Sequence, residues 1–328
     1  MSRRRSALIA ALLLPLLAAT TACGAGDDDK SEKGSDAAQP GASFPYTVDN
    51  CGVKTTYRAA PERAVTMNQH VTEIMLELGL AKSVVGTAYL DDAVLPRHKK
   101  AYDAIPVLAK EYPSKEKLLA ANPDFVYGGY GSAFEAKDGR TREELKKSGI
   151  DTRLNLEYCT KKRTTVDDLY REVEEIGRTF GVGPRAQEWI AGARATLAKT
   201  GESLKGRAPV PVFVYDSGDK TAFTAGGKGI GNELITRAGG RNVFADLDKS
   251  FGDATWEQVV ARKPEIVVIY DYGATTVEQK KKRLLNDPVL RDVPAIKNKR
   301  FAVLPLSDAV LGVRAPDAIA KLAGQITR

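Results

Sequence analysis

The sequence predicts an α/β protein of two similar lobes, each a parallel sheet flanked by helices, joined by one long backbone helix. The first observation is a repeat, because residues 116–127 match residues 257–268 without a gap. Each copy has a Glu, a short apolar helix, a Pro that ends it, an acidic residue and an apolar strand. The second observation is that strand and helix patterns alternate on both sides of a long helical pattern over residues 184–206. Such alternation is typical of parallel sheets covered on both faces.

The composition permits two domains and argues against one class of partner. The chain has 328 residues, of which 43% are hydrophobic and 28% charged, so it can bury a sizeable core. Its net charge of +7 is spread over segments of mixed sign, such as residues 161–163 and 280–283, without interleaved aromatic residues. Solvated helix ends explain these runs better than a nucleic-acid surface does, so we expect no nucleic-acid partner.

The first 22 residues have the pattern of a secretory signal sequence. Arg3, Arg4 and Arg5 precede an apolar run and a tail of small residues that ends before Cys23. The apolar run is too short for a membrane span, which needs about 20 residues. Residues 23–43 are rich in Gly, Ala, Ser, Asp and Lys, a composition that predicts a disordered tether because it buries too little apolar surface to fold.

The N-terminal lobe is expected over residues 44–183. Its strands are short apolar runs, and its helices place apolar residues at helical spacing and end at Gly, as at Gly79. A capping box formed by Thr165 and Asp168 opens the last helix of this lobe. The expected strands are residues 64–67, 84–89 and 152–158 with the strand of the first repeat copy, and the expected helices include residues 71–80 and 141–149.

The connecting helix is expected over residues 184–206, because Pro184 suits a first helical position and apolar residues form one stripe. A helix of this length would cross the side of both lobes as a stiff connector, so we expect only modest closure on binding. The C-terminal lobe is expected over residues 207–328. Its expected strands are residues 209–216, 242–245 and 301–305 with that of the second repeat copy, and its expected helices are residues 231–239, 277–285 and 316–326.

Cysteine usage fits an oxidising compartment. Apart from Cys23 the chain has Cys51 and Cys159, an even pair in a protein that faces the exterior, so we predict a disulfide between them. The alternative is two unrelated buried thiols, because sequence alone gives no distance between them.

With signal, tether, duplicated lobe and helical bridge together, residues 50–328 resemble the substrate-binding lipoproteins of bacterial ABC importers. The resemblance is to the helical-backbone class of periplasmic binding proteins, which carries ferric siderophores, haem and cobalamin. It implies that Cys23 is acylated and anchors the protein to the outer face of the cell membrane. Thr20 departs from the family's signal pattern, which usually has Leu there. Ordinary secretion with an incidental Cys23 is the alternative.

The resemblance also implies a membrane partner. In this family an exposed Glu on each lobe docks into an Arg pocket of the dimeric permease, which works with an ATPase. The matching residues are Glu116 and Glu257, the first of each repeat copy. A monomer with two lobes can bind a two-fold symmetric partner through one contact per lobe, and opposite charges orient the two proteins. The alternative is that each Glu only stabilises its helix N-terminus.

The ligand cleft should lie between the C-terminal ends of the two sheets. Residues that follow or flank the strands are therefore the candidates for ligand binding, and packing within a lobe is the alternative for each. In the resembling family, aromatic residues wall the ligand and an Arg pairs with its carboxylates or chelating oxygens. The candidates are Tyr89, Tyr112, Tyr130, Phe251 in a loop before the second repeat, Arg314 and, more weakly, His70.

The sequence gives little support for a bare-metal site, a phosphate-binding loop or catalysis. His70 and His98 are the two His of the chain, too few for a receptor of bare zinc or manganese, so we expect no direct metal site. Residues 226–231 are rich in Gly but match neither the P-loop nor the dinucleotide fingerprint, and we expect a flexible loop at the edge of the cleft. No nucleophile elbow, metal triad or paired Cys nucleophile is present, so we expect neither an enzyme nor a cofactor.

The hypothesis is a lipid-anchored receptor that captures a metal chelate outside the cell and delivers it to the permease. The leading candidate for the ligand is a ferric siderophore of the hydroxamate or mixed type. A corrinoid or a deazaflavin-type precursor is the alternative within the class, because tyrosines and one Arg suit those equally well. A secreted α/β enzyme is the alternative outside it.

Overall fold

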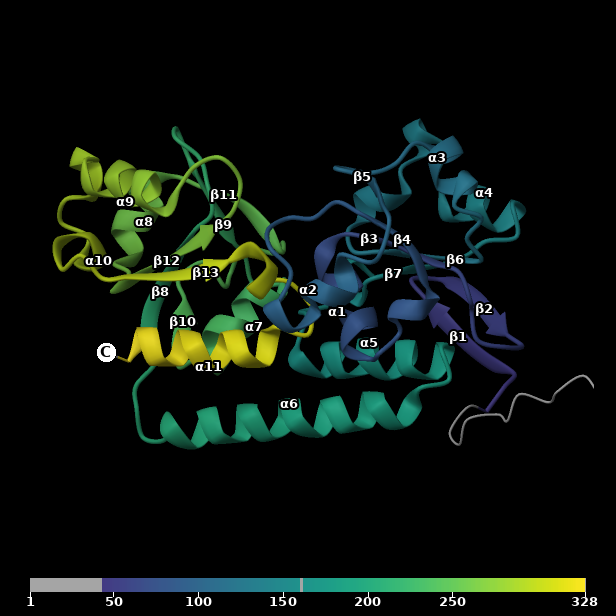
Figure 1. The fold of residues 1–328 in the computed structure, drawn as a ribbon. Helices are drawn as coiled ribbons and strands as arrows, with labels where there is room; N and C mark the ends of the chain where they lie inside the picture. The colour runs from purple at the N-terminus through teal and green to yellow at the C-terminus, as the bar shows by residue number, and fades with distance from the viewer. Residues whose placement is uncertain (1–42, 160–161, 328) are drawn as a thin grey trace, which may run out of the picture. The chain divides into compact units, whose positions relative to one another are not determined.

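The computed structural model describes residues 43–159 and 162–327 (Figure 1). The predicted signal sequence, Cys23 and nearly all of the tether lie outside the described residues. The described chain opens with an antiparallel hairpin of β1 (Tyr46–Asn50) and β2 (Val53–Tyr57), which the sequence patterns did not predict. Its turn, Cys51 and Gly52, has positive φ at both residues, the backbone of a tight hairpin turn.

The N-terminal lobe is built on a parallel sheet in the order β5-β4-β3-β6-β7. Its interior strands β3 and β6 are fully buried, as expected for a sheet covered on both faces. The strands are β3 (Ala64–Met67), β4 (Val84–Ala88), β5 (Val107–Ala109), β6 (Phe125–Gly128) and β7 (Asp151–Leu154), and the helices are α1 (Gln69–Glu77), α2 (Lys99–Tyr102), α3 (Lys115–Ala120) and α4 (Arg142–Lys147).

The C-terminal lobe is built on a second parallel sheet in the order β10-β8-β12-β13, with an antiparallel ribbon of β9 and β11 beside it. Phe251 opens β11, so the expectation that it lies in a loop is wrong. The strands are β8 (Val210–Tyr215), β9 (Ala222–Ala225), β10 (Gly240–Asn242), β11 (Phe251–Ala254), β12 (Ile266–Asp271) and β13 (Phe301–Pro305), and the helices are α7 (Ile230–Arg237), α8 (Trp256–Arg262), α9 (Val277–Leu285), α10 (Pro294–Lys297) and α11 (Ala315–Ile326).

The last helix of the N-terminal lobe and the connecting helix follow one another in the sequence between the two sheets. α5 (Val166–Thr179) begins at the predicted capping box of Thr165 and Asp168 and buries its apolar face in the core. α6 (Gly183–Ser203) packs against α5 of the N-terminal lobe and α11 of the C-terminal lobe, and Figure 1 shows it running along one side of both. At about 1.5 Å per residue it reaches roughly 30 Å. Among the described residues, no helix is long and apolar enough to cross a membrane.

The repeated stretch folds the same way twice. α3 and β6 form the first copy, α8 and β12 the second, and each strand is central in its sheet. Ser114 and Thr255 cap the two helices by accepting a backbone N–H three residues on. Asn122 and Lys263, at matching positions before Pro, both adopt positive φ, at 47° and 46°. The agreement of this rare conformation in both copies supports a duplicated unit.

Candidate functional site

The candidate site lies where the parallel strands of both sheets end. Asn68 follows β3, Tyr89 follows β4, and Tyr272 follows β12 after Asp271. Tyr130 follows β6 after Gly129. In open α/β sheets the loops at these carboxyl ends form the binding crevice, because the strands deliver them to one edge. The loops of the two lobes therefore supply the walls of one candidate site.

Asn68 organises the N-terminal wall. It is fully buried and adopts φ 98°, a strained conformation for a residue with a side chain. Its Oδ1 accepts hydrogen bonds from the Tyr112 hydroxyl at 3.1 Å and from the backbone N–H of Gly129 and Tyr130 at 3.2 and 3.3 Å. One side chain thus fixes the ends of two strands and one of the predicted aromatic residues.

Four tyrosines form an aromatic wall, which we define as Tyr89, Tyr112, Tyr130 and Tyr158. The Tyr89 and Tyr112 rings lie 4.7 Å apart, and the Tyr130 and Tyr158 rings lie 5.4 Å apart. Tyr89 also has positive φ, at 60°, and the Tyr158 side chain is 42% exposed. The structure therefore brings the predicted Tyr89, Tyr112 and Tyr130 to the same edge of the sheet.

His70 packs behind this wall. It is buried, its ring lies 5.0 Å from the Tyr130 ring, and its Nε2 lies 3.3 Å from the Gly129 carbonyl oxygen. Burial lowers the pKa of His70 to about 4, although the Gly129 carbonyl opposes the shift. His70 is therefore neutral near pH 7 and supports Tyr130 from the inside; a ligand contact for it stays a prediction.

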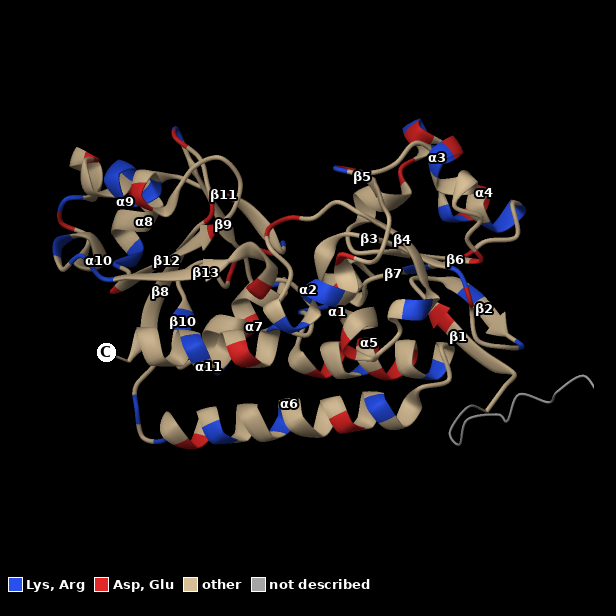
Figure 2. Cartoon of the chain, viewed as in Figure 1, with Lys and Arg blue, Asp and Glu red and all other residues tan. Residues whose placement is uncertain are grey.

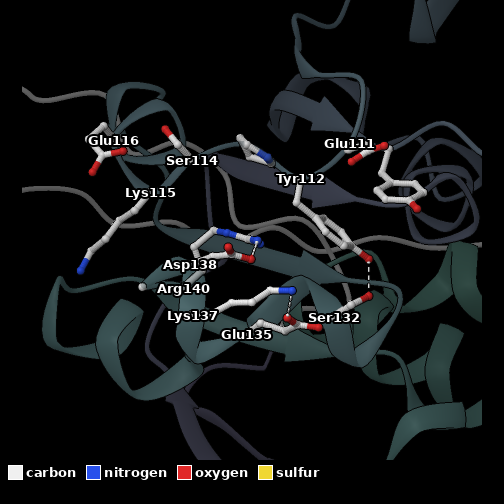
Figure 3. A pocket seen from close by; sticks show the side chains of 13 residues that line it. Glu111, Tyr112, Ser114, Lys115, Glu116, Ser132, Glu135, Lys137, Asp138 and Arg140 are labelled. Carbon is white, nitrogen blue, oxygen red and sulfur yellow. Dashed lines mark hydrogen bonds and ion pairs between the residues drawn. The ribbon is translucent and has the colours of Figure 1, made fainter.

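A pocket of about 730 Å³ opens beside Tyr89 and Tyr112 (Figure 3). Arg140 forms its floor and is 2% exposed. The guanidinium donates to the Ala133 carbonyl at 2.7 Å and to Asp138 at 2.6 Å, and lies 5.2 Å from the Tyr112 ring centre. The outer part of the pocket reaches Glu116 on α3. A buried Arg thus stacks on a tyrosine of the aromatic wall.

The C-terminal wall is also aromatic. Phe251 is half-buried and stacks on Phe223 of β9 at 5.8 Å, with Tyr270 edge-on at 6.3 Å. The Tyr272 hydroxyl donates to the buried carboxylate of Asp216. Burial raises the pKa of Asp216, and the Tyr272 hydroxyl opposes that shift. Phe251 therefore lies in a ring stack, with a ligand contact still a prediction.

A second pocket, of about 540 Å³, lies between the two lobes. Residues 91–96 of the N-terminal lobe form one side, and residues 271–273 with Pro305 form the other. Arg314 lies at its wall. Burial raises the pKa of Asp91 to about 6, and the charge of Asp92 adds to the shift. This pocket has the position expected of a cleft at the carboxyl ends of β12 and β13.

Arg314 bridges the lobes. Its Nε and Nη2 donate to both carboxylate oxygens of Glu73, at 2.7 and 2.6 Å. Nη2 also donates to the Ala93 carbonyl at 2.7 Å, and Nη1 donates to Ser307 at 2.8 Å and to Asp308 at 3.4 Å. All five N–H groups of the guanidinium are thus used within the chain. A direct ligand role for Arg314 stays a prediction and would require some of these bonds to exchange.

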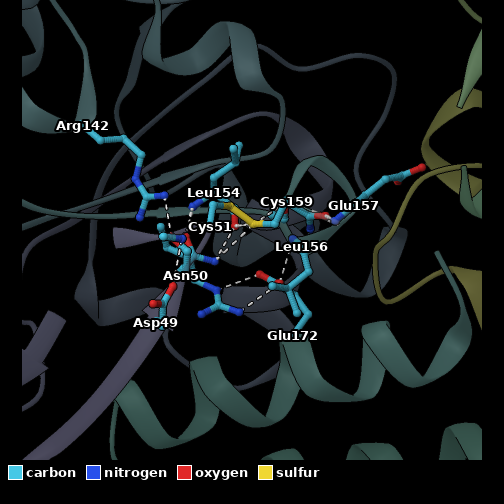
Figure 4. The surroundings of a disulfide bond; sticks show 12 residues. Asp49, Asn50, Cys51, Arg142, Leu154, Leu156, Glu157, Cys159 and Glu172 are labelled. Atoms are coloured by element: carbon cyan, nitrogen blue, oxygen red, sulfur yellow. Dashed lines mark hydrogen bonds and ion pairs between the residues drawn. A yellow bond between two sulfur atoms is a disulfide. The ribbon is translucent and has the colours of Figure 1, made fainter. Parts of the chain in front are cut away.

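A buried turn of the N-terminal lobe makes a further bridge (Figure 4). The Glu157 carboxylate accepts the backbone N–H of Ile230, at the start of α7, and of Leu311, both at 3.0 Å. Asn155 donates to the Leu311 carbonyl at 3.0 Å. Burial raises the pKa of Glu157 to about 7, opposed by the two N–H groups. The helix N-terminus of α7 is therefore satisfied by a carboxylate of the chain itself.

The Gly-rich segment before α7 is not a flexible loop edge, so that expectation is wrong. Gly226 and Gly227 are buried, and their N–H groups donate to the carbonyls of Ser250 and Leu247 at 2.9 Å. The backbone carbonyl oxygen of Lys228 accepts from the N–H of Thr164 in the N-terminal lobe at 2.8 Å. These glycines allow the backbone to pack closely, because a Cβ on Gly227 would lie 2.0 Å from a carbonyl oxygen.

The predicted disulfide joins Cys51 in the hairpin turn to Cys159, next to the bridging turn (Figure 4). Asn50 reinforces this junction, because its side chain exchanges two hydrogen bonds with the Leu154 backbone, at 2.8 and 2.9 Å. Beneath it, the buried Arg153 pairs with Glu172 at 2.8 Å. The N-terminal hairpin therefore anchors the turn that carries Glu157 and Tyr158.

Glu116 and Glu257 lie in the first turns of α3 and α8, and both are exposed. Figure 1 shows α3 at the top of the N-terminal lobe and α8 in the C-terminal lobe below α9, and Figure 2 shows acidic residues on α3. Backbone N–H groups at each helix start, with Ser114 and Thr255, lower the pKa of these carboxyls. Both carboxylates are therefore charged and available to a partner near neutral pH.

Comparison with known proteins identifies the family. The family model for periplasmic binding proteins matches residues 65–307, which is most of the chain. The chain belongs to the periplasmic binding protein family. A periplasmic binding protein from Veillonella parvula has the same fold, with 32% identity and a TM-score of 0.80, over 86% of this chain and 97% of that one.

Other relatives of this periplasmic binding protein have more specific names. An ABC-type Fe3+-hydroxamate transport system structure from Saccharomonospora viridis is 26% identical, with a TM-score of 0.74, over 87% of this chain and 100% of that one. An uncharacterized ABC transporter substrate-binding lipoprotein of Bacillus subtilis, YvrC, is 25% identical over 73% of this chain and 74% of its own. A vitamin B12-binding protein of Photorhabdus laumondii is 24% identical over 64% and 71%. All are binding or transport proteins by name.

Sequence reasoning missed several residues of this binding protein's candidate site. Asn68 and Tyr272 lie at strand ends, so the rule that found Tyr89 could have found them. Tyr158 was hidden because the expected strand over residues 152–158 ends at Leu154. Asp91 carried no signal, since its place in a pocket between lobes depends on the tertiary fold. Among the described residues, no group of three or more His, Cys, Asp and Glu could hold a metal ion.

Proposed function

We propose that the chain is the extracytoplasmic receptor of an ABC importer, and that it holds a metal chelate or comparable cofactor between the lobes. The observation that carries the proposal is the set of aromatic side chains at the strand ends of both sheets. Tyr89 and Tyr112 line the pocket of about 730 Å³ in the N-terminal lobe, and Tyr272 lines the pocket of about 540 Å³ between the lobes. Pockets of this size suit a small organic ligand, and aromatic walls supply apolar contact area.

A ferric siderophore of the hydroxamate or mixed type is the leading ligand. The Saccharomonospora viridis relative belongs by name to a Fe3+-hydroxamate transport system and spans this chain nearly completely. A corrinoid is the second candidate, because the Photorhabdus laumondii relative binds vitamin B12 by name. Both ligands are bulky, with apolar edges that tyrosines can cover, and we propose that the chain binds its ligand without turning it over.

We also propose that Cys23 carries a lipid that holds the receptor at the outer face of the cell membrane. The signal-like pattern before Cys23 and the relative named as a lipoprotein support this step. A Cys23→Ser variant expressed in its host should then leave the membrane fraction and appear in the medium. Retention of the variant in washed membranes would count against the anchor.

Delivery to a permease gives the sharpest cellular test of the receptor role. A Glu116→Ala/Glu257→Ala variant should keep its solute affinity within about three-fold of the wild type, because Glu257 lines neither of the two pockets and Glu116 lies only at the outer part of the first. Uptake of the radiolabelled solute by cells should fall at least about ten-fold, because a docking contact is lost on each lobe. The matched control is Glu174→Gln/Glu188→Gln, which removes two exposed carboxylates from α5 and α6. Unchanged uptake by the docking variant would refute this contact.

A further inference from the structure

The charges that line the candidate cleft are unbalanced. In the second pocket the lining residues Asp91, Asp92 and Asp271 face a single lining cation, Arg314, within the described residues. Figure 2 shows acidic residues on the loop that runs from the N-terminal lobe toward the C-terminal lobe. The charge that a ligand meets there depends on how far nearby cations neutralise these carboxylates.

Arg314 offsets those acids only in part. Its guanidinium is paired bidentately with Glu73 and lies 3.4 Å from Asp308, neither of which lines the pocket. A buried bidentate pair satisfies the charge and the hydrogen bonds of both partners. Arg314 is 3.9 Å from Asp92, a longer contact than any it makes with Glu73. The positive charge of Arg314 is thus largely neutralised by carboxylates of the protein itself.

The nearby lysine does not fully offset them either. Lys280 is buried, donates to the Tyr270 carbonyl oxygen and lies 4.7 Å from the Tyr272 ring. Its nearest acids include both Asp216, which is buried, and Asp271. Burial also lowers the pKa of Lys280. The charge of Lys280 is therefore shared between the carboxylates of Asp216 and Asp271. The carboxylate of Asp91 has no ion pair among the described side chains.

Among the described residues, the first pocket has one lining cation outside an ion pair, Lys115, against two such acids, Glu111 and Glu116. Arg140 is paired with Asp138 at 2.6 Å, and Lys137 is paired with Glu135 at 2.8 Å. The remaining charged lining residues are Glu111, Glu116 and Lys115. Both pockets are therefore acidic on balance, and a ligand with several negative charges would enter against repulsion.

We infer that the cleft selects a neutral or cationic chelate and rejects polyanionic ones. This inference rests on the proposed function and narrows its substrate class. It favours metal complexes whose ligands cancel the metal charge, such as a ferric trihydroxamate, over complexes with excess carboxylate or catecholate charge. Asp91 and Asp271, on opposite walls of the second pocket, are the residues expected to set this preference.

A matched series of three probes tests the inference on the purified protein. Each is the same linear ferric trihydroxamate, with its terminal amine left as an ammonium, acetylated, or succinylated to a carboxylate. In fluorescence quenching titrations at low salt, the acetyl form should bind as tightly as the ammonium form or more weakly. The succinyl form should bind at least about ten-fold more weakly than the ammonium form. An Asp91→Asn/Asp271→Asn variant should reduce that ratio to about three-fold or less, while the charge-matched control Glu174→Gln/Glu188→Gln should keep it.

The outcomes separate the inference from the function it rests on. Equal affinities across the series, or tightest binding of the succinyl form, would overturn the charge selection while leaving a chelate receptor intact. A preference that survives in the Asp91→Asn/Asp271→Asn variant would overturn the assignment to these two carboxylates. Binding of none of the three probes would contradict the hydroxamate proposal itself, and the charge inference would fall with it.

Discussion

Two buried titratable groups near the candidate site respond to pH in opposite directions. The pKa of His70 is lowered to about 4, so between pH 4 and its unfolded value near 6.5 the unfolded chain binds more protons. Its contribution to stability is therefore lost as pH falls through that window. The pKa of Glu157 is raised to about 7, so between about 4.5 and 7 the folded chain binds more protons, and stability is lost as pH rises.

Single variants should show how each of the two groups makes the free energy of unfolding depend on pH. Each group changes the free energy of unfolding by about 3 kcal/mol across its window, at 1.36 kcal/mol per pKa unit. Relative to the wild type, a His70→Gln variant should lose free energy of unfolding as pH rises from 4.5 to 7. In this variant the Glu157 contribution, which falls as pH rises, is no longer offset by the His70 contribution, which rises. A Glu157→Gln variant should become more stable as pH rises over the same range. Asp91, whose pKa is raised to about 6, contributes equally to all three proteins.

Urea unfolding at four pH values between 4.5 and 7 measures these slopes. The comparison uses the difference between variant and wild type at each pH, so that other titrating groups cancel. Glu157→Gln also loses one acceptor for the N–H of Ile230 or Leu311, which shifts the whole curve without changing its slope. Two variant curves that run parallel to the wild type would show that neither group titrates as argued.

At the scale of elements, the hairpin and the bridging turn act together. The disulfide ties the β1–β2 turn to Cys159, and the adjacent Glu157 and Tyr158 supply an inter-lobe bridge and part of the aromatic wall. A constraint on the β1–β2 hairpin therefore reaches the candidate cleft through the three consecutive residues 157–159. This link explains why a structural disulfide should affect ligand binding as well as stability.

Removing the disulfide tests that link. A Cys51→Ser/Cys159→Ser variant should lose about 2–5 kcal/mol of unfolding free energy, because the unfolded chain gains freedom over a separation of 108 residues. Solute affinity should also fall, since the turn that presents Tyr158 is less constrained. Reductant should weaken the wild type and leave the variant unchanged, which serves as the control. Full affinity in the variant would separate the disulfide from the cleft.

The sequence predicted the repeated elements well because their signals are local. The capping residues, the helix-ending Pro and the apolar strand of each copy all act within about twelve residues, and both copies fold accordingly. The hairpin β1–β2 was missed because its alternation of buried and exposed residues spans only five positions a strand. The Gly-rich segment was misjudged because its hydrogen bonds come from residues 247–250, which no local pattern reveals.

The candidate site was predicted in part, and for the same reason. Tyr89 and Tyr130 were found because strand ends can be read locally. Arg314 was a candidate for ligand binding, and the structure pairs it with Glu73, which lies 241 residues away in the sequence. No spacing rule links two such residues. Partner choice at a buried ion pair therefore depends on how the lobes pack.

At the scale of the whole molecule, the lobes are held by more than the connecting helix. Arg314 with Glu73, Glu157 with two N–H groups, and Thr164 with Lys228 all cross from one lobe to the other. Breaking a buried pair costs about 3–5 kcal/mol, so large opening of these contacts is unfavourable. We therefore expect a largely preformed cleft that closes modestly on its solute, with side-chain movement greater than lobe movement.

The central claim is that a metal chelate or corrinoid binds at the strand ends between the two sheets. The most direct measurement is a calorimetric titration of the purified protein with a panel of ferric siderophores and corrinoids, repeated on a Tyr130→Ala/Tyr272→Ala variant. One panel member should bind with one-to-one stoichiometry and Kd below about 1 μM, and the variant should bind it at least about thirty-fold more weakly, because each wall loses a ring. Binding of no panel member, or equal affinity in the variant, would contradict the account.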